Sequence, residues 1–285
     1  MKFNLEAKLV NEQIIDIREI KNIFISYTSD TVNLYKVDSD KVILKEYMNY
    51  EPEKEELANI TINNNKLIIE SGERMLKIFN YLIRKIEIYI PSNYANDDFE
   101  IITSSGSIKS DESFKFSNFK ATSKSGSIKL KDICANNINA QASSGSIFME
   151  NANGNRIFKT SSGSIKVLNG CGDSIFSSSS GSITVNNMVG KLEASASSGS
   201  VKATINELNN DIDISVSSGS ANITLPPSSS FKLNAQTSSG SIKTYFDNQL
   251  FYNKKGNQAS GVVGDNPTIS INVKTSSGSV KINNI

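Results

Sequence analysis

Histidine and tryptophan are absent from this chain of 285 residues, and cysteine occurs only twice. Without histidine the chain cannot build a Ser-His-Asp or Cys-His nucleophile system, nor most catalytic zinc sites. Neither a Gly-x-Gly-x-x-Gly nor a Gly-x-x-x-x-Gly-Lys phosphate-binding loop is present. We therefore expect a protein that is not an enzyme and that has no cofactor and no metal site.

Long apolar runs are also missing. Charged residues at Glu6, Lys8, Glu12 and Asp16 interrupt the N-terminal segment, so it lacks the continuous apolar stretch of a secretory signal. No segment has the length and apolarity of a transmembrane helix. These absences leave the compartment unknown, and we expect a protein that is cytoplasmic or peripherally associated with the cell envelope.

What the chain does have is a repeat. The tripeptide Ser-Gly-Ser occurs nine times, and all but the last interval between its glycines measure 18 to 21 residues. A fixed period of this length is typical of a solenoid, in which each repeat buries its apolar face against its neighbours. We expect the glycines of the motif to mark structural corners: Gly106, Gly126, Gly145, Gly163, Gly181, Gly199, Gly219, Gly240 and Gly278.

Apolar and polar residues alternate on both sides of each motif, which is the pattern of a half-buried β-strand. Ile128, Ile147 and Ile165 each stand two residues after a glycine, and triads such as Leu192/Ala194/Ala196 precede the motif. Across the motif the inward positions are an odd number of residues apart, so the chain must bend there. Glycine suits this bend because it has no Cβ and tolerates positive φ. The pattern predicts an all-β fold, a parallel β-solenoid of about nine to ten rungs.

The two cysteines test this register. Cys134 and Cys171 each lie eight residues after a motif glycine, with one rung between them. Two strand spacings would separate their Cα atoms by roughly 9.6 Å, beyond the roughly 4.4–6.8 Å that a disulfide spans. We predict two free thiols, which fits a reducing compartment.

The first 100 residues differ in charge from the rest, with 13 basic and 18 acidic side chains against 17 and 11 in residues 101–285. We expect residues 1–100 to form a β-rich N-terminal cap that covers the edge of a solenoid spanning residues 101–285. The segment 47–56 is expected to end a strand and continue as an acidic, solvated loop. Strand-like runs in the cap are Asn22–Tyr27, Thr31–Val37, Lys41–Tyr47, Asn59–Asn63, Lys66–Glu70 and Lys85–Ile90.

The last interval between motif glycines is 38 residues long. Because residues 247–267 contain three glycines and no clear alternation, we expect one rung with a loop excursion there. The loop is either a tolerated insertion or a binding loop that presents Phe246, Phe251 and Tyr252.

Six lysines share the position three residues after the motif glycine, which points outward. Stacking would align them into a stripe interrupted by Phe148, Thr184 and Asn222. The stripe either keeps the strand faces soluble or contacts an anionic cell-envelope polymer or a membrane surface. Nucleic acid is disfavoured as a partner because few aromatic residues interleave with the stripe and the net charge is +1. These lysines are Lys109, Lys129, Lys166, Lys202, Lys243 and Lys281.

The nearest pair of carboxylates in the repeat region is Asp211 and Asp213, which flank a core isoleucine. A single pair of this kind is typical of a solvated strand face, and a metal or acid-base role is the alternative. We find no column of carboxylates of the kind that a carbohydrate-cleaving β-helix needs.

The SSGSI motif at this spacing, preceded by the segment KIEIYIPSNYANDDFEIITSSGSI, resembles the bacterial putative-adhesin family of β-strand-repeat proteins. The resemblance covers essentially the whole chain. It implies a β-solenoid, an adhesin-like role and, for some relatives, an association with cell-envelope stress. It implies no catalytic residues.

Two functional hypotheses remain open. The first is a non-catalytic, adhesin-like binding or envelope-associated protein that uses a flat strand face or the lysine stripe. The second is a cytoplasmic scaffold that self-assembles end to end. It rests on the last motif glycine, Gly278, which is followed by only seven residues in the given sequence and so suggests an uncapped C-terminal rung.

Overall fold

The computed structural model of the chain describes residues 6–73, 82–94, 98–246 and 250–285. These residues are organised in β-strands, with one 3-10 turn, η1 (Lys54–Glu56). The chain divides into two compact units, residues 1–137 and residues 138–285, and the division falls within strand β11 (Ile128–Ala142).

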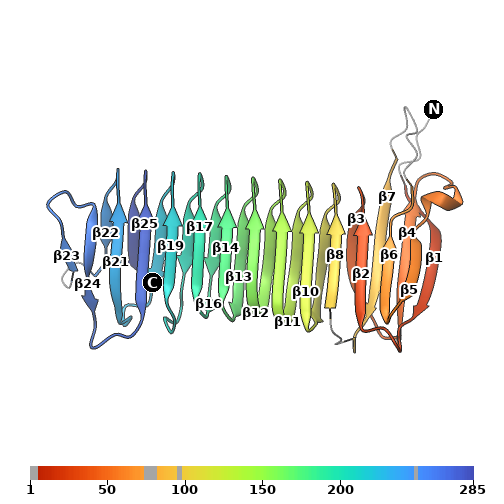
Figure 1. The fold of residues 1–285 in the computed structure, drawn as a ribbon, viewed down its shortest axis with the longest axis horizontal. Helices are drawn as coiled ribbons and strands as arrows, with labels where there is room; N and C mark the ends of the chain where they lie inside the picture. Colours follow the sequence, from red (N-terminus) through yellow and green to blue (C-terminus); the bar gives the residue numbers. More distant parts are fainter. Residues whose placement is uncertain (1–5, 74–81, 95–97, 247–249) are drawn as a thin grey trace. The chain divides into compact units, whose positions relative to one another are not determined.

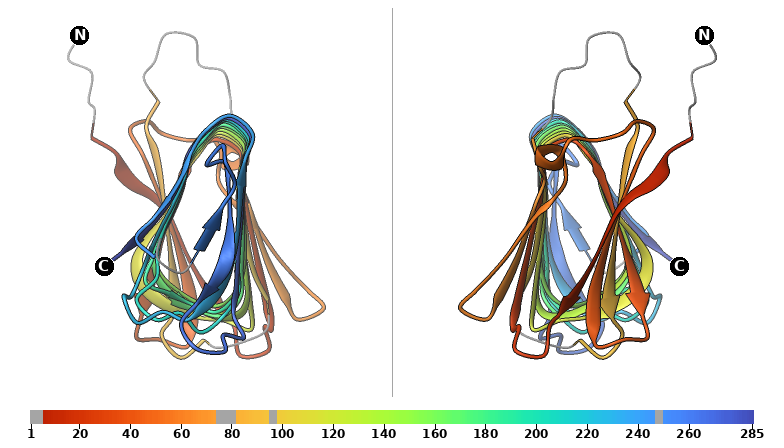
Figure 2. Two further views of the ribbon diagram at one scale, coloured as in Figure 1. Left: turned by 90° about the vertical axis from the view of Figure 1, so that its left-hand side faces the viewer. Right: turned by 90° about the vertical axis from the view of Figure 1, so that its right-hand side faces the viewer.

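In residues 138–285 each repeat contributes one strand before the Ser-Ser-Gly-Ser corner and one after it, so the strands form two layers that meet at the corners (Figures 1 and 2). Most neighbours in a layer are parallel and in register. The layer before the corner contains, in spatial order, the second half of β12 (Ile147–Thr160), β14 (Ser174–Ser178), β17 (Leu192–Ala196), β19 (Ile212–Val216), β25 (Ser270–Thr275), β21 (Phe231–Thr237), β24 (Gln258–Val263) and β23 (Leu250–Tyr252).

The layer after the corner begins with the first half of β12, which pairs with β13 (Ile165–Cys171). The short strand β16 (Met188–Val189) pairs with the end of β13. The remaining strands of this layer are, in spatial order, β15 (Ile183–Asn186), β18 (Val201–Thr204), β20 (Ala221–Leu225), β26 (Val280–Asn284) and β22 (Ile242–Thr244).

The core of this unit lies between the two layers. Inward side chains from equivalent positions lie over one another, as the period predicts, and each fully buried aliphatic side chain contributes roughly 1.5–3 kcal/mol. Phe158 and Phe176 contribute ring contacts at 5.2 Å between centroids. One buried column consists of Ile147, Ile165, Ile183, Val201, Ala221, Val280 and Ile242.

The corners confirm the bend and the need for a residue without a Cβ, but they do not have the positive φ that the sequence allowed for. None of the corner glycines is among the residues with positive φ. Instead, a Cβ added to Gly181 would overlap the carbonyl oxygen of Gly163, and one added to Gly163 would overlap that of Gly145. Glycine is therefore required because each corner packs directly on the backbone of the next one. Positive φ occurs at the opposite turns, at Gly172 and Asn187.

Hydroxyl groups satisfy the polar backbone at the corners. Inside, the Oγ of Ser178 donates to the carbonyl of Gly163 at 3.1 Å, and the amide of Gly181 donates back to Ser178 at 2.9 Å. Outside, the Oγ of Ser146 accepts from the amide of Ser164 at 3.1 Å, which links one repeat to the next. Unpaired buried backbone groups would otherwise destabilise this edge.

The end of the unit corrects the prediction of an uncapped C-terminal rung. Strand β26 lies between β20 and β22, and β25 lies between β19 and β21. The last repeat in sequence is therefore an internal rung, and the chain reaches it by passing over the end and returning. This order leaves no C-terminal rung at the edge, and with it the basis for end-to-end stacking through that rung is lost.

The segment between the last two motifs contains strands. Residues 247–249 lie outside the described residues, and β23 and β24 follow them as an antiparallel hairpin that pairs with β21. In the view along the stack, β23 lies across the open end between the two layers (Figure 2, left). Phe246 is buried and contacts Phe231 edge-on at 5.3 Å, while Phe251 is 81% exposed.

Residues 1–137 also form two layers. One contains β5 (Asn59–Asn63), β6 (Lys66–Glu70), β2 (Asn22–Tyr27), β8 (Asp98–Thr103) and β10 (Asn118–Ser123). The other contains β1 (Lys8–Asp16), β4 (Lys41–Met48), β7 (Arg84–Pro91), β3 (Thr31–Val37), β9 (Ile108–Lys115) and the first part of β11. The six strand-like runs of residues 22–90 are confirmed within one residue at each end, whereas β1 was not anticipated.

Strands β2 and β3 form a rung of the same kind although they lack the motif. A Cβ added to Gly106 would overlap the carbonyl oxygen of Asp30, so residues 28–30 supply the corner beneath the first Ser-Gly-Ser. The expectation of a solvated acidic loop at residues 47–56 is wrong in one respect. Glu56 is fully buried. Its carboxylate accepts hydrogen bonds from the Tyr50 hydroxyl at 3.1 Å and the Glu53 amide at 3.0 Å, which replace contacts with water.

Candidate functional site

Four of the six lysines lie in residues 138–285, on the outer surface of the layer after the corner. Their strands are β13, β18, β26 and β22, and all four side chains are exposed. The register places Lys281 directly beside Lys243, an adjacency that sequence order does not suggest. Along the layer the column reads Phe148, Lys166, Thr184, Lys202, Asn222, Lys281 and Lys243.

This lysine column carries little compensating charge. Among the described residues, none of its four ammonium groups forms an ion pair, in contrast to Lys191 on the other layer, whose Nζ lies 2.6 Å from Glu193. The columns on either side hold a single carboxylate, Glu150. Lys166 contacts the ring of Phe148, with its Nζ 5.8 Å from the centroid. The surface is therefore positively charged and open to solvent.

The other two lysines lie in residues 1–137. Lys109 and Lys129 are neighbours on β9 and β11, and the register continues from Lys109 to Asn33 and then to Glu87 on β7. Beyond Asn33 the column is no longer basic, because Glu87 accepts a hydrogen bond from Tyr89 at 2.9 Å and pairs with Lys85 at 2.6 Å. In this unit the lysine column is limited to two residues.

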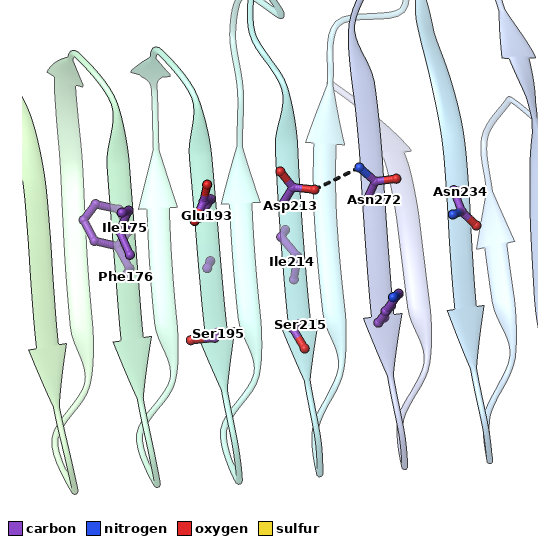
Figure 3. A pocket seen from close by; sticks show the side chains of 11 residues that line it. Ile175, Phe176, Glu193, Ser195, Asp213, Ile214, Ser215, Asn234 and Asn272 are labelled. Carbon is purple, nitrogen blue, oxygen red and sulfur yellow. Dashed lines mark hydrogen bonds between the residues drawn. The ribbon is translucent and has the colours of Figure 1, made fainter.

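A groove lies on the outer surface of the other layer in residues 138–285 (Figure 3). It has a volume of about 470 Å³ and crosses β14, β17, β19, β25 and β21. Its side chains come from two adjacent outward columns of the strands. The outward side chains that line it are Ile175, Glu193, Ser195, Asp213, Ser215, Asn234, Asn272 and Lys274.

Hydrogen bonds fix the polar side chains of the groove. Asn272 donates its amide to Asp213 at 2.8 Å, the contact drawn in Figure 3. Lys191 lies 2.6 Å from Glu193 and 4.0 Å from Asp213, so one ammonium group faces both carboxylates. The hydrogen bond that Lys191 donates to Glu193 raises the pKa of Lys191. The groove thus places the carboxylates of Glu193 and Asp213 beside the ammonium group of Lys191.

The carboxylates of the groove are not placed for general acid catalysis. The carboxylates of Glu193 and Asp213 are 43% and 40% exposed, so they are solvated, whereas a general acid at neutral pH needs a desolvated carboxyl. Asp211 is taken up by the backbone, because its carboxylate accepts from the Ser270 amide at 2.7 Å. In the part of the chain that the structure describes, no group of three or more His, Cys, Asp or Glu side chains could hold a metal ion.

The sequence located the lysines of the column but not the groove. Asp213 was recognised, but its partner Asn272 is 59 residues away and becomes a neighbour only because β25 is inserted beside β19. The one sign of the groove in the sequence is that Asp213 and Asn272 each stand at an outward position between two inward apolar residues. The two cysteines are free thiols, as the register predicts.

The aromatic residues near the end of residues 138–285 divide between core and surface. Tyr245 and Phe251 are 66% and 81% exposed, and the Tyr252 hydroxyl lies 3.2 Å from that of Thr244. The sequence-based alternative of a binding loop named Phe246 as well, but that side chain belongs to the core. Across the described ranges, no helix has the length and apolarity to cross a membrane.

Residues 20–283 match the model of the Toastrack family, DUF4097, which spans both the paired layers and the corners described above. The chain belongs to this family. Membership agrees with the all-β, solenoid-like architecture. None of the curated proteins matches the chain.

Three solved structures are similar to this Toastrack chain. One, described as a "putative cell adhesion protein" from Clostridium sporogenes, is 13% identical with a TM-score of 0.26, covering 98% of this chain and 100% of its own. A "putative adhesin" from Bacteroides fragilis is 16% identical, with a TM-score of 0.46 and coverage of 98% and 97%. A "putative adhesin" from Parabacteroides distasonis is 11% identical, with a TM-score of 0.45 and coverage of 97% and 98%.

Proposed function

We propose that this Toastrack protein is a non-catalytic, adhesin-like binding protein that associates with the cell envelope by contacting an anionic polymer through its lysine columns. The observation that carries the proposal is the column of Lys166, Lys202, Lys281 and Lys243. Its ammonium groups share one exposed surface and form no ion pair among the described residues. Lys109 and Lys129 provide a shorter column of the same kind in residues 1–137.

The spacing of the column suits a chain of repeated negative charges. Adjacent strands are about 4.8 Å apart, so the ammonium groups recur at intervals of about 4.8 or 9.6 Å along the layer. Because the strands fix the spacing, the backbone does not have to rearrange on binding. Only the lysine side chains lose conformational freedom. An extended polymer with phosphate groups could therefore contact several lysines at once.

The expected affinity is modest. A lysine near an anionic surface contributes about 1 kcal/mol, so four to six lysines give roughly 4–6 kcal/mol. That corresponds to dissociation constants from about a millimolar to tens of micromolar. Contacts of this strength become effective when many copies face one long polymer, because each further contact is then intramolecular.

The absence of histidine and the solvated carboxylates support a non-catalytic role. A membrane surface with anionic headgroups offers the same charge chemistry as a polymer, but its plane would meet the lysines of one column only if the layer lay flat on it. We favour a polymer because the lysines form a line along the stack.

The test compares binding of the purified protein to long-chain inorganic polyphosphate with binding of a variant in which Lys109, Lys129, Lys166, Lys202, Lys243 and Lys281 are all changed to Gln. We expect the variant to bind at least tenfold more weakly, because the charges that contact the polymer are gone. A second arm uses vesicles that contain phosphatidylglycerol, and binding to vesicles alone would identify a membrane as the partner.

The matched control changes six other lysines to Gln and so produces the same net charge. It uses Lys115, Lys120, Lys159, Lys191, Lys232 and Lys274, which lie outside the two columns. Equal loss of binding in both variants would show that only the net charge matters. Retained binding in the variant that lacks the six column lysines would refute the proposal.

A further inference from the structure

We propose that the groove across β14, β17, β19, β25 and β21 binds a segment of an extended, uncharged glycan. The groove lies on the opposite layer from the lysine column, so this inference stands apart from polyanion binding. Its volume of about 470 Å³ falls within the roughly 300–1,000 Å³ typical of small-molecule sites.

The first argument is the order of side chains along the groove. The register aligns one outward residue from each strand into a single column. In spatial order the column reads Ile157, Ile175, Glu193, Asp213, Asn272 and Asn234. The column therefore starts as an exposed apolar surface, with Ile157 and Ile175 38% and 43% exposed, and continues as a row of carboxylates and amides.

This combination matches the chemistry of a sugar. A pyranose presents C–H groups on its ring faces and hydroxyls around its rim. Isoleucine side chains can cover the former, and carboxylates and amides can accept from and donate to the latter. Asp213 orients the amide of Asn272 at 2.8 Å, so the pair is arranged before a ligand arrives. Serines in the neighbouring column, Ser195 and Ser215, add further hydroxyl groups.

The second argument is the repeat distance. Outward side chains recur along the column at about 4.8 Å, the spacing of adjacent strands. That is similar to the length of one sugar unit in an extended glycan chain, so consecutive units would meet equivalent positions on consecutive strands. A chain lying across the strands can thus place successive units over Ile175, Glu193, Asp213, Asn272 and Asn234.

The third argument is charge balance, which favours an uncharged ligand. Glu193 and Asp213 are faced by Lys191, and Lys274 lines the groove as the second ammonium group. Two negative and two positive side chains give no net attraction for a polyanion or a polycation. Hydrogen bonds to charged groups nevertheless contribute more to affinity than neutral ones.

The experiment measures binding of four neutral hexasaccharides, cellohexaose, chitohexaose, maltohexaose and mannohexaose, by isothermal titration calorimetry with the full chain. We expect at least one to bind. We also expect the affinity to stay constant when the salt concentration rises and when the six column lysines are changed to Gln. Loss of polyphosphate binding with retained hexasaccharide binding would separate this site from the lysine columns.

Two variants locate the site. E193Q/D213N keeps the shape of both side chains but removes the charges, and we expect at least tenfold weaker binding. Ser195→Tyr fills the groove from an exposed position and should abolish binding. Asn222→Ala, on the outer surface of the other layer, is the control with unchanged affinity. Failure of all four hexasaccharides to bind at millimolar concentration, or binding unaffected by both groove variants, would overturn the inference.

Discussion

At the scale of single residues, the corner glycines are determined by packing between repeats. The carbonyl of one corner glycine occupies the position that a Cβ of the next would need, and this holds from Gly145 through Gly163, Gly181 and Gly199. The buried hydroxyls of Thr160 and Ser178 then satisfy the same carbonyls. Corner sequence and stacking distance are therefore linked, which explains why the motif tolerates so little variation within this chain.

Gly181→Ala tests the packing. The added methyl group would overlap the carbonyl of Gly163, so the corner must shift, and we expect a loss of roughly 3 kcal/mol in the free energy of unfolding. The neighbouring Ser180→Ala removes only an exposed hydroxyl and should change that free energy by less than about 0.5 kcal/mol. Chemical denaturation of both variants measures the difference, and similar stabilities would refute close stacking at the corner.

A second residue-scale feature is the carboxylate of Glu87 in residues 1–137. Burial raises its pKa, but hydrogen bonds from Lys85, Tyr89 and Tyr47 outweigh burial and hold the pKa below its ordinary value of 4.5. Desolvation by burial raises the pKa of Tyr89, and the hydrogen bond that Tyr89 donates to Glu87 raises it further. A carboxyl whose pKa is lowered by folding stabilises the folded state above its unfolded pKa.

Glu87→Gln should therefore cost about 2 kcal/mol at neutral pH, since hydrogen bonds to a charged group are lost. The wild-type protein should lose this contribution as the pH falls from about 4.5 through the lowered pKa of Glu87, and the difference between the two proteins should shrink over that range. Denaturation at a series of pH values checks this. A difference that persists at the acid end would assign the effect to packing.

At the scale of elements, the sequence predicted strands well and their spatial order less well. Alternation identified the strand-like runs of residues 22–90, because half-buried strands carry that pattern directly. It could not place β25 and β26, since Ile242 and Val280 are interchangeable members of one column. Both orders bury the same side chains, and in the structure the hairpin β23–β24 pairs with β21 at the edge of its layer.

Buried charges were equally invisible at this scale. Arg156 is 1% exposed and donates to the carbonyls of Cys171 and Gly172 at the turn opposite the corner. Burial lowers its pKa to about 10. Arg156 stands at an inward position of its strand, two residues before Phe158, and a lone arginine there gives no sign in the sequence that it will close a turn.

Disulfide trapping tests the strand order. In a background without Cys134 and Cys171, the pair Asn222→Cys and Lys281→Cys lies on adjacent parallel strands about 4.8 Å apart, within reach of a disulfide. We expect this pair to oxidise readily. The pair Asn222→Cys and Lys243→Cys is separated by β26 and should not. Mass spectrometry under mild oxidation measures both, and the reverse result would show that the repeats stack in sequence order.

At the scale of the whole molecule, the lysine columns and the groove lie on the strand layers of the described residues. The lysine columns were predicted because a period aligns them wherever the strands stack. The groove was not, because Asp213 and Asn272 meet only through the inserted last repeat. The proposed function rests on repeated weak contacts, which makes the ionic-strength dependence of binding informative.

The most direct measurement is therefore the affinity for long-chain polyphosphate over a series of sodium chloride concentrations. Each lysine that contacts a single-stranded polyanion adds about 0.7 to the slope of log affinity against log salt. For four to six contacts the account predicts a slope between about −3 and −4. It also predicts a much shallower slope when the six column lysines are changed to Gln. The slope should be nearly unchanged in the control variant, in which six lysines outside the columns are changed to Gln. Equal slopes in the two variants would contradict it.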